Sequence, residues 1–142
     1  MKNAIQQRAR IARVRRIQHG LAASAAAKAA GQVQLLESNQ EKLARMRGEL
    51  RPSAGPSTGA TLAQLGELAM RLDSARIGLG RSIDSARSVA IARESERISA
   101  RREQESAEKL QKAAIDAAVA LAERRPLRSG RPRTRLSDGE TM

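Results

Sequence analysis

Two long proline-free segments constrain this chain more than any other feature. All four prolines lie in two short stretches, Pro52 to Pro56 and Pro126 to Pro132, and alanine supplies 27 of the 142 residues. Alanine is the strongest helix former, but its side chain buries little apolar area. Phe, Trp, Tyr and Cys are absent. The sequence therefore predicts an all-α protein made of long helices without a thick core.

The signals that end helices divide the chain into four parts. Thr61 and Gln64 form a candidate capping box, in which each side chain bonds the backbone N–H of the other residue at the start of the second helix. Pro126 is expected to end that helix, and the Arg-, Gly- and Ser-rich residues after it to be disordered. The predicted parts are a helix over 5–50, a loop over 51–60, a helix over 61–125 and a tail over 126–142.

Apolar residues recur every seven positions, which is the spacing of a coiled-coil seam. In the second helix a row in steps of seven from Leu65 to Leu121 has Arg93 as its one polar member, and a weaker companion row starts three residues on, at Leu68. In the first helix the predicted row begins Ile11, Val14, Gln18, Leu21 and ends at Leu50, with an added four-residue step between Ala25 and Ala29. An insertion of that kind unwinds a supercoil locally.

The turn-forming loop makes an antiparallel pairing of the two helices the natural one. Residues 1–125 are thus predicted to form one elongated antiparallel two-helix coiled coil, a helical hairpin followed by a disordered basic tail. The alternative is a chain that is disordered in isolation and folds on a partner, because Leu, Ile and Val are few and the net charge is +12.

Positive charge gathers at the two ends of the chain. Residues 1–20 carry +6 without one acidic residue, and residues 124–142 carry a net +4. A hairpin would bring these ends together into a basic tip that attracts an acidic partner. The second helix is the longer one, so Ala107 to Arg125 is expected to overhang and either expose an apolar stripe or fray.

No catalytic or cofactor-binding pattern is present. His19 is the one histidine and cysteine is absent, so no zinc site is expected, and the carboxylates near Glu105 are expected to form a surface charge network. Gly78-Leu79-Gly80 lacks the features of a phosphate-binding loop. The chain is predicted to be no enzyme and to bind no metal, cofactor or small-molecule substrate.

No apolar run approaches the ~20 residues that cross a bilayer. Three weaker alternatives concern the Arg-rich start. It could act as a secretion signal, as an organellar transit peptide, or, over residues 5–21, as an amphipathic helix lying on a membrane.

Three stretches resemble the flagellar type III export stalk family, small bacterial coiled-coil proteins similar in form to the shaft of rotary ATPases. They are the basic start from Arg8 to Arg16, the Ala-rich continuation into Leu35-Leu36-Glu37 and Leu43, and the segment from Arg101 to Leu110, and the loop near residue 55 adds to the resemblance. The resemblance implies a coiled-coil component in bacterial flagellum biogenesis, type III secretion, protein transport, and chemotaxis and motility. It places the chain in the cytoplasm, on the cytoplasmic face of the inner membrane at the flagellar base, membrane-associated only through its partners.

The partners that the resemblance implies are the hexameric export ATPase, the membrane export gate and export chaperones. By position, the ATPase-binding residues would be Arg8, Arg13, Arg16, Arg101, Arg102 and Lys109. The gate-binding residues would be Gln40, Leu43, Met46 and Leu72.

A basic nucleic-acid-binding protein of the nucleoid type is the alternative function. The isoelectric point near 11.6 favours phosphate contacts, whose strength depends on salt. No aromatic residue is available to stack on bases, and no recognition motif occurs, so specific nucleic-acid binding is not expected.

Overall fold

The protein is built from two long helices, α1 (Lys2–Glu49) and α2 (Gly59–Ser129), which have 48 and 71 residues. The computed structural model describes residues 2–51 and 58–129, and it contains no strand within them. This confirms the prediction of an all-α protein. The residues of the predicted tail from 130 onward, and residues 52–57 of the predicted loop, lie outside the described part of the chain.

The start of α2 differs from the predicted capping box. Thr58 precedes the helix, and its hydroxyl oxygen accepts a 3.3 Å hydrogen bond from the backbone N–H of Thr61, while its carbonyl accepts one from Leu62. The two threonine hydroxyls are 2.8 Å apart. Thr58 is therefore the N-cap, and Thr61 lies inside the first turn. The predicted capping box was wrong because the Thr58 hydroxyl accepts from a backbone N–H of the first helical turn. Gly59 and Ala60 are therefore part of the helix.

Pro126 does not end α2 as predicted. The helical backbone continues to Ser129. Proline has a helical φ of its own and removes one hydrogen-bond donor, so a helix close to its end can continue past it for a few residues.

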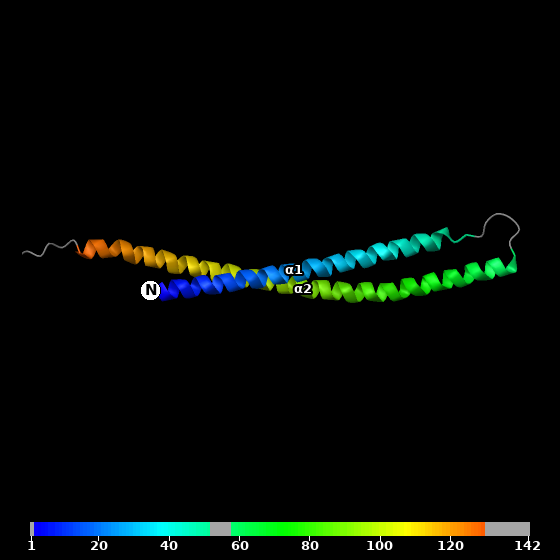
Figure 1. Ribbon diagram of the computed structural model, residues 1–142, viewed down its shortest axis with the longest axis horizontal. Coiled ribbons are helices and arrows are strands. Elements are labelled where there is room, and N and C mark those ends of the chain that lie inside the picture. Colours follow the sequence, from blue (N-terminus) through cyan, green and yellow to red (C-terminus); the bar gives the residue numbers. More distant parts are fainter. Residues whose placement is uncertain (1, 52–57, 130–142) are drawn as a thin grey trace, which may run out of the picture. The chain divides into compact units, whose positions relative to one another are not determined.

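The described residues pack as two units, each containing a segment of both helices. Of the described residues, the terminal unit comprises 2–16 and 102–129, and the loop unit comprises 17–51 and 58–101. Within each unit the segments of α1 and α2 run side by side in opposite directions (Figure 1). In the loop unit Arg47 pairs with Asp73 and Glu37 with Arg87, so residue numbers rise along α2 as they fall along α1. This arrangement is compatible with a helical hairpin.

One of the two predicted rows in α2 faces inward. Every member of the row from Leu65 to Leu121 is buried or half-buried except Arg93 and Leu121. All members of the predicted companion row from Leu68 to Ala117 are exposed, so that row was wrong. The true companion starts four residues after Leu65, and all its members are buried or half-buried: Ala69, Arg76, Ile83, Ala90, Arg97, Gln104, Gln111 and Ala118. This row was not predicted because several of its members are polar, although the aliphatic stems of such side chains pack well.

The predicted row of α1 was also wrong in its first half. Ile11, Val14 and Leu21 are exposed by 38%, 48% and 68%, whereas Ala12 and Ala26 are buried. The inward residues repeat every seven positions without an inserted step: Ile5, Ala12, His19, Ala26, Val33, Gln40 and Arg47 form one row, and Arg15, Ala22, Ala29, Leu36, Leu43 and Leu50 form the other. Alanine on the inside lets the two backbones come close, which the larger aliphatic residues would prevent.

The overhang predicted to begin at Ala107 does not begin there. Ala107 is 7% exposed, and in the terminal unit it lies with Leu110 beside Ile11 of α1. The prediction of an overhang from Ala107 assumed that the last residues of α1 lie opposite the first residues of α2. In the loop unit, however, Arg47 at the end of α1 pairs with Asp73, well inside α2. Part of the extra length of α2 therefore lies on the loop side.

Candidate partner-binding surfaces

The terminal unit carries a segment of α1 that is basic throughout. Lys2 to Arg16 contains one lysine, five arginines and no acidic residue. Arg8, Arg10 and Arg13 are exposed, and among the described residues none of them forms an ion pair. Their positive charges are thus available to a partner.

Two ion pairs fix the rest of this segment to α2. The guanidinium of Arg15 donates to Glu103 at 2.8 Å, and that of Arg16 donates to Glu108 at 3.4 Å. The side chain of Gln104 also donates to Glu108, at 2.9 Å. The hydrogen bond from Gln104 is the largest cause that lowers the pKa of Glu108; burial raises this pKa, and the hydrogen bond and charge of Arg16 lower it further. Glu108 therefore stays ionised and keeps the arginine in place.

Five of the six residues predicted to bind an ATPase lie in the terminal unit. Arg8, Arg13, Arg16, Arg102 and Lys109 are all exposed there. Arg16 differs from the others because it is already engaged by Glu108. The sixth, Arg101, is the last residue of the loop unit.

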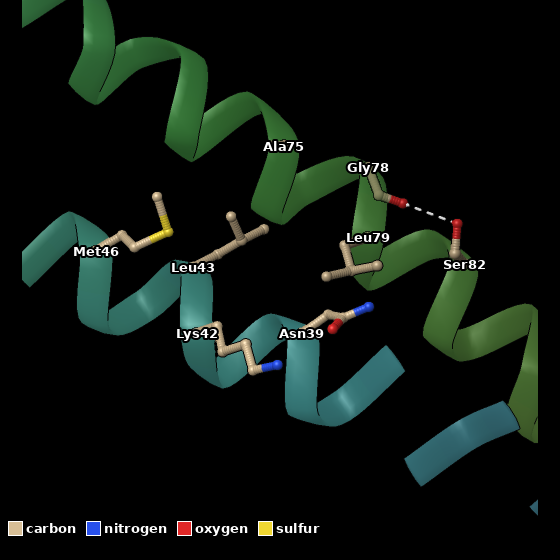
Figure 2. Close-up of a pocket in the computed structure, with 8 residues that line it drawn as sticks. All are labelled: Asn39, Lys42, Leu43, Met46, Ala75, Gly78, Leu79 and Ser82. Atoms are coloured by element: carbon tan, nitrogen blue, oxygen red, sulfur yellow. Dashed lines mark hydrogen bonds between the residues drawn. The ribbon is translucent and has the colours of Figure 1, made fainter. Parts of the chain in front are cut away.

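A groove of about 550 Å³ lies between the helices in the loop unit (Figure 2). Leu43 of α1 and Leu79 of α2 project into the space between the helices, and Met46 lies next to Leu43 (Figure 2). The remaining lining residues are Asn39, Lys42, Ala75, Gly78 and Ser82. The groove exists because Ala75 and Gly78 have almost no side chain, and a Cβ added at Gly78 would meet nothing within 4 Å.

The four residues predicted to bind an export gate are separated by this geometry. Leu43 and Met46 line the groove, and Met46 is 51% exposed. Leu72 is only 8% exposed, so it packs in the seam and is covered from partners. Gln40 lies with Glu37, Asp84 and Arg87 in a second, more polar hollow.

Sequence reasoning missed the small residues that open the groove. Ala75 and Ser82 belong to the companion row that starts at Leu68, which was expected to face inward. The helix continues unbroken through Gly78, where the hydroxyl of Ser82 donates to the Gly78 carbonyl at 3.3 Å. The spacing of Ala75, Gly78 and Ser82 on one helix face was the signal that could have shown the groove.

No family model, curated protein or solved structure matches the chain. Among the described residues, no helix combines the length and apolar character that crossing a membrane requires. The same residues contain no group of three or more His, Asp or Glu side chains able to hold a metal ion.

Proposed function

We propose that this protein is a non-catalytic stalk that couples the hexameric ATPase of a bacterial flagellar type III export apparatus to its membrane export gate. In this role the terminal unit contacts the ATPase and the loop unit contacts the gate. The protein acts on the cytoplasmic side of the inner membrane and reaches the membrane only through its partners, with export chaperones as further ligands.

The proposal includes coiled-coil packing of α1 against α2. Its support is the pair of inward rows in each helix, which repeat every seven residues, as in a left-handed supercoil. Seven of the nine members of the row that starts at Leu65 are buried or half-buried, although four of those members are alanines. A long, thin helix pair of this kind suits a stalk that connects two partner proteins.

The observation that carries the proposal is the charge of the terminal unit. Arg8, Arg10 and Arg13 project from a helix segment with no acidic residue, while Glu103 and Glu108 of α2 pair with Arg15 and Arg16. Free guanidinium groups on a rigid helix favour an acidic protein surface, and they speed association with it. Such a surface would be found in the opening of an ATPase ring.

The groove of the loop unit supports the other half of the proposal. It exposes Leu43, Met46 and Leu79 between two helices, with Lys42 at the margin. An apolar groove with a polar edge is a common receptor for an amphipathic helix of another protein. We propose that the export gate supplies such a helix.

Binding to the purified export ATPase of the source bacterium tests the proposal. Replacing Arg8 and Arg13 by Glu reverses two free charges, and we expect binding measured by biolayer interferometry to weaken at least ~10-fold, mostly through slower association. The matched control reverses Arg45 and Arg81, which are exposed in the loop unit. It should bind within about two-fold of the wild type.

Two results would contradict the proposal. One is equal weakening by both double variants, which would indicate that only net charge matters. The other is absence of binding to the ATPase together with a saturable complex on a DNA probe at physiological salt, which would favour the nucleic-acid-binding alternative.

A further inference from the structure

A row of large apolar side chains lies exposed along α2 in the loop unit. Met70, Ile77, Ile91 and Ile98 are 72%, 64%, 72% and 40% exposed, and they follow one another at multiples of seven residues. Asp84 occupies the one missing position of the series. These four apolar residues are called the isoleucine stripe.

The isoleucine stripe is separate from the seam between α1 and α2. The seam uses Ile83, which is 5% exposed, whereas Ile77 and Ile91 on either side of it are open to solvent. Single exposed aliphatic residues are common on protein surfaces, but a regular heptad row of them is the pattern of a helix that packs against another helix. This face of α2 therefore has the pattern of a second contact surface.

The face of α1 beside Ile91 and Ile98 carries small residues. Arg87 donates to Glu37 at 2.8 Å, and both residues line one hollow with Asp84, so Glu37 and the stripe lie on the same side of the helix pair. Ala30 and Ala23 precede Glu37 by one and two heptads and share its face. The two ion pairs of the loop unit, Glu37 with Arg87 and Arg47 with Asp73, set Ala30 opposite residues 90–94 and Ala23 opposite residues 97–101, close to the levels of Ile91 and Ile98. The bulky side chains of Ile91 and Ile98 on α2 thus lie beside a flat strip of α1 formed by Ala30 and Ala23.

We propose that a second copy of this chain packs on this face, with the isoleucines of each copy resting on the alanines of the other. A ridge beside a flat strip is self-complementary under a two-fold rotation about an axis parallel to the helices, because each ridge then meets the partner's flat strip at the same level. Another protein would have to supply both features in the same spacing, whereas a second copy supplies them by construction.

The size of the face agrees with a dimer. The distance along α2 from Met70 to Ile98 is about 42 Å at 1.5 Å per residue, and two helices side by side are about 20 Å wide. The face thus offers roughly 800 Å² per copy, which is the amount that a standard stable interface buries on each partner. Asp84 and Arg87 place charges of both signs near its centre, which favours one register over others.

Light scattering coupled to gel filtration tests the dimer. At about 50 µM, where a standard interface is occupied, the wild type should have twice the chain mass of 15.3 kDa. The I77E/I91E variant should be a monomer, with dimer dissociation shifted at least ~100-fold by two charges buried in the contact. I77A/I91A retains helix propensity, so it should show a smaller shift in the same direction while its helicity stays unchanged.

The matched control is V89E/L35E. Val89 and Leu35 are 48% and 56% exposed, but they lie outside the isoleucine stripe, so this variant should remain a dimer. The chain has no cysteine, and a mixture of singly substituted I91C with A30C, or of I98C with A23C, should form a disulfide between copies. A monomeric wild type at this concentration would overturn the proposal, as would a control that dissociates as readily as I77E/I91E.

Discussion

At the scale of single residues, the interior is limited to a few side chains. Among the residues that the structure describes, the buried apolar ones are Ala12, Ala26, Leu72, Ile83 and Ala107. Three of the five are alanines, so Leu72 and Ile83, the two large side chains, each remove more apolar area from water than any of these alanines. The stability of the loop unit should accordingly be concentrated at Leu72 and Ile83.

The substitution Ile83→Ala tests how much of the stability of the loop unit depends on this side chain. We expect a loss of about 2 kcal/mol in the free energy of unfolding, at the lower end of the range for such truncations because the site lies close to the surface and can collapse. Urea titration followed by circular dichroism measures it. Leu35→Ala is the control, since Leu35 is 56% exposed and its truncation should change stability by no more than about 0.5 kcal/mol. Equal effects of the two changes would show that Ile83 has no special place in the core.

At the scale of helices, the sequence predicted the two elements and one of the inward rows, but not the partner rows. The row from Leu65 was found because its members are mostly Leu and Ala. The row with Arg76, Arg97 and Gln104 was missed because a polar head group conceals an aliphatic stem that packs. The first half of α1 was assigned to the wrong face because size was taken as a sign of burial. In a pair of alanine-rich helices the smaller residue faces inward, as Ala12 does beside the exposed Ile11.

Of the two candidate sites, the basic segment could be predicted from the sequence and the groove could not. The basic segment around Arg8 and Arg13 could be found from charge alone, because no acidic residue occurs near it. The burial of Leu72 and the groove beside Leu43 could not, since both depend on the relative rotation and register of two helices. That rotation is set by contacts between residues far apart in sequence, such as Arg47 with Asp73.

The start of α2 gives a prediction at this scale. Thr58→Ala removes the hydroxyl that accepts from the N–H of Thr61, and it should cost the first turn about 1 kcal/mol. We expect amide hydrogen exchange at Thr61 and Leu62 to become roughly five-fold faster, with little change near Ile83. Thr61→Val keeps the shape of the side chain and leaves the Thr58 cap intact, so it should have a smaller effect. If Thr61→Val accelerated this exchange more than Thr58→Ala does, Thr61 and not Thr58 would be the N-cap.

For the molecule as a whole, charge opposes folding. The net charge is +12, and the arginines of residues 2–16 repel one another along a single helix. Among the described residues, four ion pairs join α1 to α2, but all of their side chains are at least partly exposed, so each contributes little. Repulsion should therefore outweigh these attractions when salt is low.

Thermal unfolding at two salt concentrations tests this balance. Raising NaCl from about 10 mM to about 150 mM shortens the Debye length from ~30 to ~8 Å and screens the repulsion, so we expect the midpoint to rise. A gain of about 1 kcal/mol would correspond to roughly 3–5 °C in a chain of this size. The variant R8Q/R10Q/R13Q lacks three of the repelling charges and keeps every ion pair between the helices, so its midpoint should be higher at low salt and should depend less on salt. A midpoint that falls as salt is added would mean that the four ion pairs contribute more than the repulsion among the arginines.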